Sequence, residues 1–140
     1  MNRRRATILL HWFSLVSLML LMAGGPVPLL GWAFAASALM MTGIAIAQGL
    51  MSGPGPKLEG WLRRAHPWLS RGMYALLALS AVLTITYLLG RGTAGIRLSD
   101  LYFVLMSVAS LHGIFHLWRH TALGDGAFRR MTPKALHGLL

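Results

Sequence analysis

The sequence predicts an all-α membrane protein, a single domain over residues 1–140 built as an up-down bundle of four transmembrane helices. The first observation is composition: 56% of the residues are hydrophobic and only 11% are charged, about half the charged fraction of a typical soluble domain. Mean hydropathy is +0.61. The second observation is that the apolar residues gather in four runs, each close to the roughly 20 residues that cross a bilayer. We therefore expect the chain to lie in a lipid bilayer.

The first two helices are predicted over residues 6–23 and 29–51. Between them the sequence Gly-Gly-Pro-Val-Pro predicts a tight turn with almost no loop. The second helix is expected to end before the Gly-Pro-Gly-Pro sequence at residues 53–56, which no helix crosses. Three arginines at residues 3–5 precede the first apolar run, as they would in a signal peptide. No cleavage site follows, so we expect a retained signal-anchor helix.

The third and fourth helices are predicted over residues 72–89 and 100–118. The third follows a basic loop in which His66 stands beside Pro67, and His66 is expected to lie at the surface. The fourth follows the short link at residues 90–99. With these two helices, the chain is predicted to cross the bilayer four times.

Basic residues are distributed unevenly between the two ends of the predicted bundle. Three regions, the N-terminal arm, the loop between the second and third helices, and the tail, contain Arg3, Arg4, Arg5, Lys57, Arg63, Arg64, Arg71, Arg119, Arg129, Arg130 and Lys134. The opposite side contains only Arg91 and Arg97. The positive-inside rule therefore predicts that both termini are cytoplasmic. This placement accounts for the net charge of +10, so a nucleic-acid partner is not expected.

Several kinds of functional site are excluded by residue usage. The chain has no cysteine, which rules out disulfides, thiolate metal sites, iron–sulfur clusters and thioether-attached haem. Its three acidic residues, Glu59, Asp100 and Asp125, all lie at or beyond the predicted membrane edges. They are too few for a hydrolytic metal site, and they leave no credible Ser-His-Asp arrangement.

Two histidines inside apolar runs are the most informative residues of the chain. An ionisable side chain in hydrocarbon is costly and indicates a function. His11 in the first helix and His112 in the fourth are expected within about 10 Å of each other in depth, and these helices are neighbours in an up-down bundle. Two such imidazoles suit the axial positions of a haem iron. Alternatively, His11 is an interfacial residue beside Trp12, and His112 hydrogen-bonds to a nearby hydroxyl such as Ser107.

The remaining histidines near the fourth helix allow other assignments. His116 lies one turn from His112 on the same face and is the rival iron ligand. His120 follows Arg119 near the headgroup region. His137 lies in the tail and has no assigned role.

At these positions the chain resembles the bacterial cytochrome b561 family of four-helix membrane cytochromes. The similar stretches are His11-Trp12 and the block Leu-His-Gly-Ile-Phe-His-Leu-Trp-Arg-His at residues 111–120, followed by Arg-Arg-Met-Thr-Pro at residues 129–133. The resemblance implies one haem b ligated by His11 and His112 near the cytoplasmic face. It also implies electron exchange with the quinone pool in the bacterial inner membrane.

Members of this family typically carry a second haem on the outer side. Its ligands would come from residues 29–34 and 97–102, which contain no histidine here. We therefore expect a single haem, with Arg71, Arg119 or His120 holding its propionates. Without an outer haem, exchange with a quinone or with a partner redox subunit is a more plausible role than electron transfer across the membrane.

Two alternatives belong to different functional classes. The first is a haem-free accessory or assembly subunit that retains the cytochrome scaffold. Small residues in the second helix, such as Ala36 and Gly43, could serve a partner subunit or a homodimer, although ordinary packing within the bundle is preferred. The second is a quinone-binding module without haem.

Overall fold

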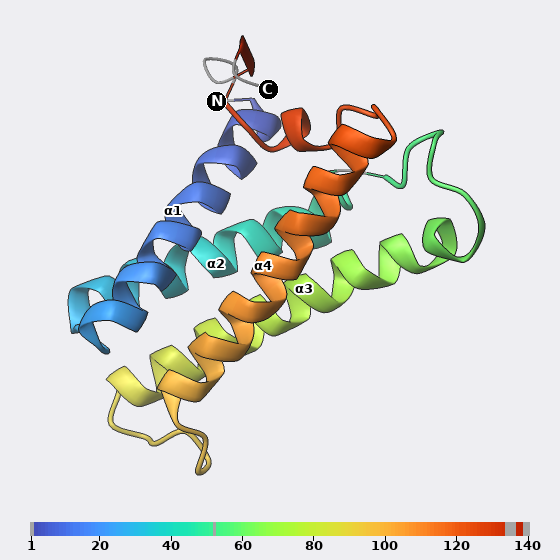
Figure 1. Ribbon diagram of the computed structural model, residues 1–140. Helices are drawn as coiled ribbons and strands as arrows, with labels where there is room; N and C mark the ends of the chain where they lie inside the picture. The colour runs from blue at the N-terminus through green and yellow to red at the C-terminus, as the bar shows by residue number, and fades with distance from the viewer. Residues whose placement is uncertain (1, 52, 134–136, 139–140) are drawn as a thin grey trace.

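The structure, a computed structural model, describes residues 2–51, 53–133 and 137–138. Over these residues it is helical and contains no strand. The elements are α1 (Arg3–Gly24), α2 (Pro28–Gln48), α3 (Gly60–Leu88), α4 (Leu98–Ala122) and the short 3₁₀ helix η1 (Phe128–Arg130) (Figure 1). All four α-helices are long and apolar enough to cross a membrane, which confirms the predicted transmembrane four-helix character.

Local sequence chemistry sets the ends of α1 and α2. Asn2 caps α1, since its side-chain oxygen accepts a hydrogen bond from a backbone N–H of the first turn at 3.1 Å. Gly25 ends α1 with a φ of +77°, which favours glycine. Pro28 begins α2, where its missing N–H costs no hydrogen bond. Gly49, also at +77°, ends α2 after Gln48 rather than at the predicted residue 51.

The predicted start of the third helix and the predicted end of the fourth are wrong, whereas the end of the third and the start of the fourth agree to within two residues. α3 begins at Gly60 instead of residue 72 and continues through Pro67. Hydropathy marks only the apolar part of a helix, whereas arginines such as Arg63 and Arg64 interrupt the apolar run but are good helix formers. For the same reason α4 continues past residue 118 to Ala122.

The bundle is packed most tightly in the half away from the termini. Each helix contacts the next and α4 returns to α1, with α1–α2 and α2–α3 the most extensive pairs. Two buried hydrogen bonds join neighbours: Ser14 Oγ shares one with Ser37 Oγ at 2.8 Å, and Thr84 Oγ1 shares one with the Tyr102 hydroxyl at 2.9 Å. The core around them contains Leu18, Leu21, Phe34, Ala35, Ala38, Met41, Leu77, Ala81, Tyr102 and Leu105.

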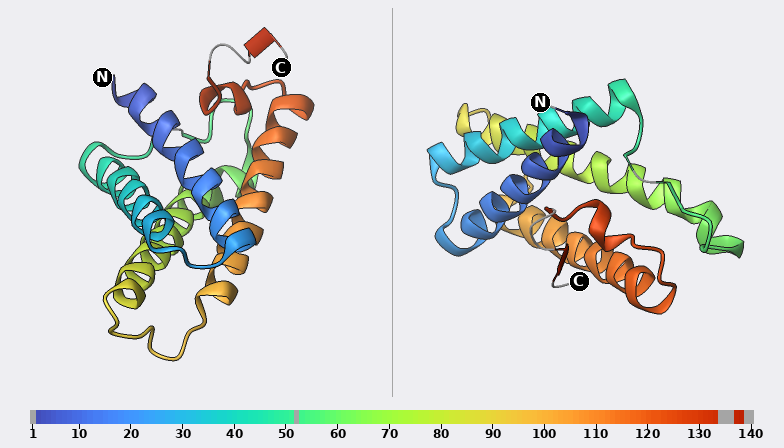
Figure 2. Two further views of the ribbon diagram at one scale, coloured as in Figure 1. Left: turned by 90° about the vertical axis from the view of Figure 1, so that its left-hand side faces the viewer. Right: turned by 90° about the horizontal axis from the view of Figure 1, so that it is seen from above.

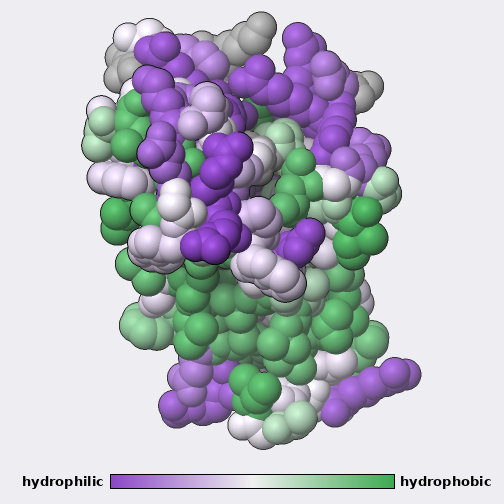
Figure 3. Space-filling model, turned by 90° about the vertical axis from the view of Figure 1, so that its right-hand side faces the viewer, coloured by the Kyte–Doolittle hydropathy of each residue, from purple (hydrophilic) through white to green (hydrophobic). Residues whose placement is uncertain are grey.

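The other half of the bundle is more open. Figure 2 (left) shows α1 and α4 diverging toward the end of the molecule where both termini lie. On the face shown in Figure 3, an apolar band separates a large hydrophilic surface at that end from a smaller one at the opposite end. This band is the surface that a bilayer would cover.

Candidate functional site

Four histidines come together in the half of the molecule where α1 and α4 diverge. His11 lies on α1, His66 on α3, and His112 and His116 one turn apart on α4. The ring centroids of His112 and His116 are 4.5 Å apart, and those of His66 and His116 are 6.0 Å apart. His11 lies close enough to His112 for charges on the two imidazoles to interact. The structure thus brings the two predicted ligands into one group, together with their rival His116.

His66 is the most deeply buried of these imidazoles, with only 2% of its surface exposed, so the expected surface position is wrong. Its place follows from the true start of α3, because His66 shares the inward face of that helix with Met73 and Leu77. The spacings of seven and four residues are helical. This periodicity could have revealed His66 from the sequence, had the helix been extended past its basic residues.

Both ring nitrogens of His66 lack a hydrogen-bond partner among the described residues, and so does Nδ1 of His116. A buried polar group left without a partner costs roughly 1–3 kcal/mol. Native folds therefore rarely retain such groups unless a ligand, an ion or a water satisfies them. The unpartnered nitrogens make this part of the bundle the candidate binding site.

A cavity of about 270 Å³ lies between α3 and α4 beside these nitrogens. Its polar groups are the imidazoles of His66, His112 and His116 and the hydroxyl of Ser70. The rest of the wall is apolar and consists of Leu69, Met73, Val108, Leu111 and Phe115. An apolar wall with a few converging polar groups is the usual make-up of a cofactor or small-molecule site.

The chain after α4 returns to α1 at the same end of the bundle. Trp12 Nε1 donates a hydrogen bond to the carbonyl of Met131 at 3.0 Å, and Arg4 Nη2 donates one to the carbonyl of Arg129 at 3.3 Å. η1 consequently lies between the ends of α1 and α4 (Figures 1 and 2). These contacts join the two diverging helix ends next to His11.

Arg119 joins three segments at the end of α4, where it is 0% exposed. Its Nε donates a hydrogen bond to Asp125 Oδ2 at 2.8 Å, and its Nη2 donates to the same oxygen and to the carbonyl of Pro54 at 2.6 Å. Its Nη1 has no partner within the described part of the chain. The guanidinium carbon lies 5.9 Å from the ring centroid of Phe115, a residue in the wall of the histidine cavity.

The carboxyl group of Asp125 is held in its charged form. Burial raises the pKa of Asp125, but hydrogen bonds from Arg119 and from the Ala127 backbone, with the positive charges of Arg119 and Arg130, outweigh it and leave this pKa below its ordinary value. Asp125 therefore neutralises the buried guanidinium of Arg119 at neutral pH.

The other two residues expected to hold haem propionates do not line the histidine cavity. Arg71 is exposed, with its guanidinium carbon 5.1 Å from the ring centroid of Trp68, on the side of α3 opposite His66. His120 is half-buried, with its ring centroid 6.4 Å from that of Phe128. Arg119 contacts Phe115 in the wall of that cavity.

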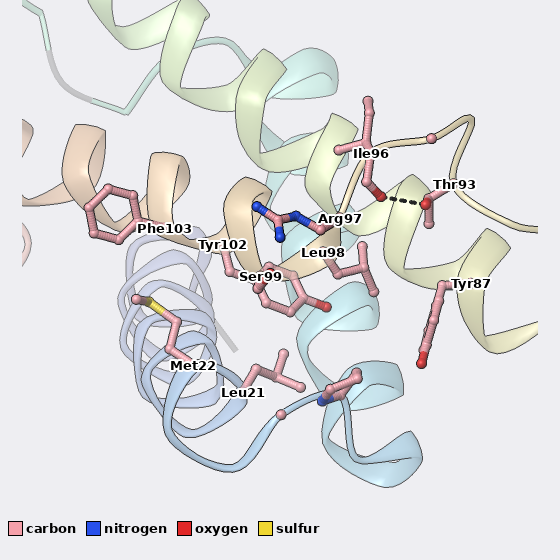
Figure 4. Close-up of a pocket in the computed structure, with 13 residues that line it drawn as sticks. Leu21, Met22, Tyr87, Thr93, Ile96, Arg97, Leu98, Ser99, Tyr102 and Phe103 are labelled. Atoms are coloured by element: carbon pink, nitrogen blue, oxygen red, sulfur yellow. Dashed lines mark hydrogen bonds between the residues drawn. The ribbon is translucent and has the colours of Figure 1, made fainter.

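A second cavity, of about 660 Å³, lies at the opposite end of the bundle. Leu21, Met22, Tyr102 and Phe103 line it, with the connection between α3 and α4 at its edge (Figure 4). The Tyr102 hydroxyl is already bonded to Thr84, and Arg97 at the rim is paired with Asp100. Within the described residues, no buried side-chain nitrogen or oxygen of this cavity lacks a partner, unlike those of the histidine cavity.

Comparisons with models of protein families, with curated proteins and with solved structures find no match to this chain. Among the described residues no group of three or more histidine, aspartate or glutamate side chains is arranged to hold a metal ion.

Proposed function

We propose that this protein is a membrane cytochrome of the b561 type that transfers electrons through one haem b. The observation that supports the proposal is the approach of His11 on α1 to His112 on α4 inside a bundle of four apolar helices. Haem iron needs only two ligands from the protein, because the porphyrin supplies four. Neighbouring helices of a four-helix bundle commonly supply such a pair.

The residues around this pair fit a haem. His112 lines the apolar cavity together with His66 and His116, whose ring nitrogens include three without a partner among the described residues. Arg119 has one guanidinium nitrogen without a partner, and guanidinium groups bind carboxylates such as haem propionates well. His11 and His112 would ligate the iron, and Arg119 would hold a propionate.

The haem would supply the one-electron chemistry, and the protein would set its potential through axial ligation and local polarity. We propose that the electrons are exchanged with a membrane quinone or with a partner redox subunit. The clustering of basic residues at the end that carries both termini supports a bacterial inner-membrane location with cytoplasmic termini. On this arrangement the haem lies near the cytoplasmic face.

Haem content of histidine variants tests the ligand assignment. His11→Ala and His112→Ala are each expected to lose the haem from protein made under haem-replete conditions. His116→Ala should retain it, and so should His137→Ala, the matched control, whose imidazole is hydrogen-bonded to the Thr132 carbonyl in the tail. Haem would be quantified per chain by absorption.

Two other results would change the assignment. Loss of haem from His116→Ala with retention in His112→Ala would make His116 the ligand. Wild-type protein without haem would instead favour a haem-free accessory subunit, for which the exposed small residues Ala36 and Gly43 on α2 offer a contact surface.

A further inference from the structure

The first part of α3 carries a row of alternating tryptophan and arginine side chains. Trp61, Arg64, Trp68 and Arg71 are spaced by three, four and three residues, so they lie along one face of the helix. All four are exposed, and the two tryptophans are 69% and 70% exposed. We refer to these four residues as the Trp/Arg row.

The opposite face of the same segment is held against the bundle. His66, 2% exposed, lies on that face, and Ser70 and Met73 join it in the wall of the histidine cavity. The orientation of the segment is therefore fixed by packing, and the Trp/Arg row points away from the protein.

The length of α3 places the row at the membrane boundary. Its 29 residues measure roughly 43 Å along the helix axis, whereas the hydrocarbon core of a bilayer is about 30 Å thick. The apolar part after Arg71, residues 72–88, measures roughly 26 Å and lies at the lower limit of the roughly 17–25 residues with which a helix crosses that core. The segment that precedes it, with Arg63, Arg64 and Arg71, must lie among the headgroups because charges in hydrocarbon are costly.

The chemistry of the row matches an anionic phospholipid. Tryptophan prefers the headgroup region, and arginine binds phosphate oxygens through paired N–H donors. The Arg71 guanidinium carbon lies 5.1 Å from the Trp68 ring centroid, a stacking contact that keeps the charge at the surface. No acidic residue occurs between positions 60 and 99, so no carboxylate of this stretch competes for these arginines.

We propose that the Trp/Arg row binds the phosphate headgroups of anionic phospholipids in the leaflet next to the basic loops. Arg64 and Arg71 contact the phosphates, and Trp61 and Trp68 lie at the glycerol level beside them. This contact anchors the start of α3 and with it His66. The proposed lipid contact does not depend on the proposed haem.

Lipid binding to the purified full chain in detergent tests this proposal. Phosphatidylglycerol and phosphatidylcholine would be titrated separately, and bound lipids counted by native mass spectrometry. The double variant Arg64→Gln/Arg71→Gln should bind phosphatidylglycerol about thirtyfold more weakly than the wild type, since each cation near a membrane surface contributes about 1 kcal/mol. Its binding of phosphatidylcholine should not change.

The control variant Arg5→Gln/Arg129→Gln removes two exposed charges from the same end of the molecule but outside the row. It should retain most of the affinity for phosphatidylglycerol. Equal losses in the two double variants would show diffuse attraction and overturn the proposal, as would an unchanged affinity of Arg64→Gln/Arg71→Gln. Competition by inorganic phosphate at the lipid's own concentration would also overturn it, because the site would then recognise free phosphate. Haem content, measured on the same samples, tests the proposed function separately.

Discussion

At the scale of single residues, two buried polar side chains at the open end of the bundle differ in how far their hydrogen bonds are satisfied. Arg119 is satisfied in part by Asp125 and by the Pro54 carbonyl, whereas both nitrogens of His66 lack partners among the described residues. The first arrangement stabilises the fold, because a buried charge with its counter-charge removed is strongly unfavourable. The second is unfavourable in the protein alone, and a ligand, an ion or a water would satisfy it.

Removing the carboxylate of Asp125 tests the structural role of Arg119. The Asp125 side chain is 1% exposed, so Asp125→Asn should lower the free energy of unfolding by roughly 3 kcal/mol or more. Asp100→Asn is the matched control, because Asp100 pairs with Arg97 at a side-chain exposure of 54%, and exposed pairs contribute at most about 1 kcal/mol. Chemical unfolding in detergent measures the free energy of unfolding of both variants. Similar losses in the two variants would contradict the assigned role.

The same pair predicts an acid-dependent loss of stability. Because the pKa of Asp125 is lower in the folded protein than in the unfolded chain, its contribution is complete at neutral pH. It should fall as the pH drops below the ordinary aspartate pKa, about 4, toward the lower folded value. Unfolding measured between pH 7 and pH 3 should show a smaller acid-induced loss in Asp125→Asn than in the wild type. Equal acid-induced losses of stability in the two proteins would show that groups other than Asp125 cause the loss.

At the scale of helices, small residues allow α1, α2 and α3 to approach closely. Ala38 is fully buried, whereas Ala36 on the same helix is exposed. Ala38→Leu should therefore lower the free energy of unfolding by about 1–3 kcal/mol through overpacking. Ala36→Leu adds the same atoms to an outward face and should change stability by less than about 0.5 kcal/mol. Thermal unfolding compares them, and equal effects would contradict the assigned packing.

The four helices could be predicted from the sequence because each has an apolar run of membrane-crossing length, and glycine and proline mark the turn at Gly25. The start of α3 could not be predicted from hydropathy, since a helix continues through Arg63 and Arg64 without any change in backbone hydrogen bonding. The buried position of His66 could not be predicted either, because it depends on where α3 starts. The approach of His11 to His112 was expected from helix order, whereas the contact of Arg119 with Pro54 joins residues 65 positions apart and has no local signal.

At the scale of the whole molecule, both termini lie at the end with the larger hydrophilic surface (Figures 1 and 3). We predict that this end faces the cytoplasm. The chain contains no cysteine, so single cysteines can be introduced without background. Arg5→Cys and Arg129→Cys should react with an impermeant maleimide only in inverted vesicles, and Arg91→Cys only in intact cells. Labelling of Arg5→Cys in intact cells would contradict this orientation.

The most direct test of the central proposal is a reduced-minus-oxidised absorption spectrum of the purified wild-type protein, with haem quantified per chain. The arrangement of His11 and His112 predicts one low-spin haem b per chain. Protein produced under haem-replete conditions that contains no haem would contradict the cytochrome assignment. Two haems per chain would contradict the single-site arrangement, because a second pair of ligands would then be required.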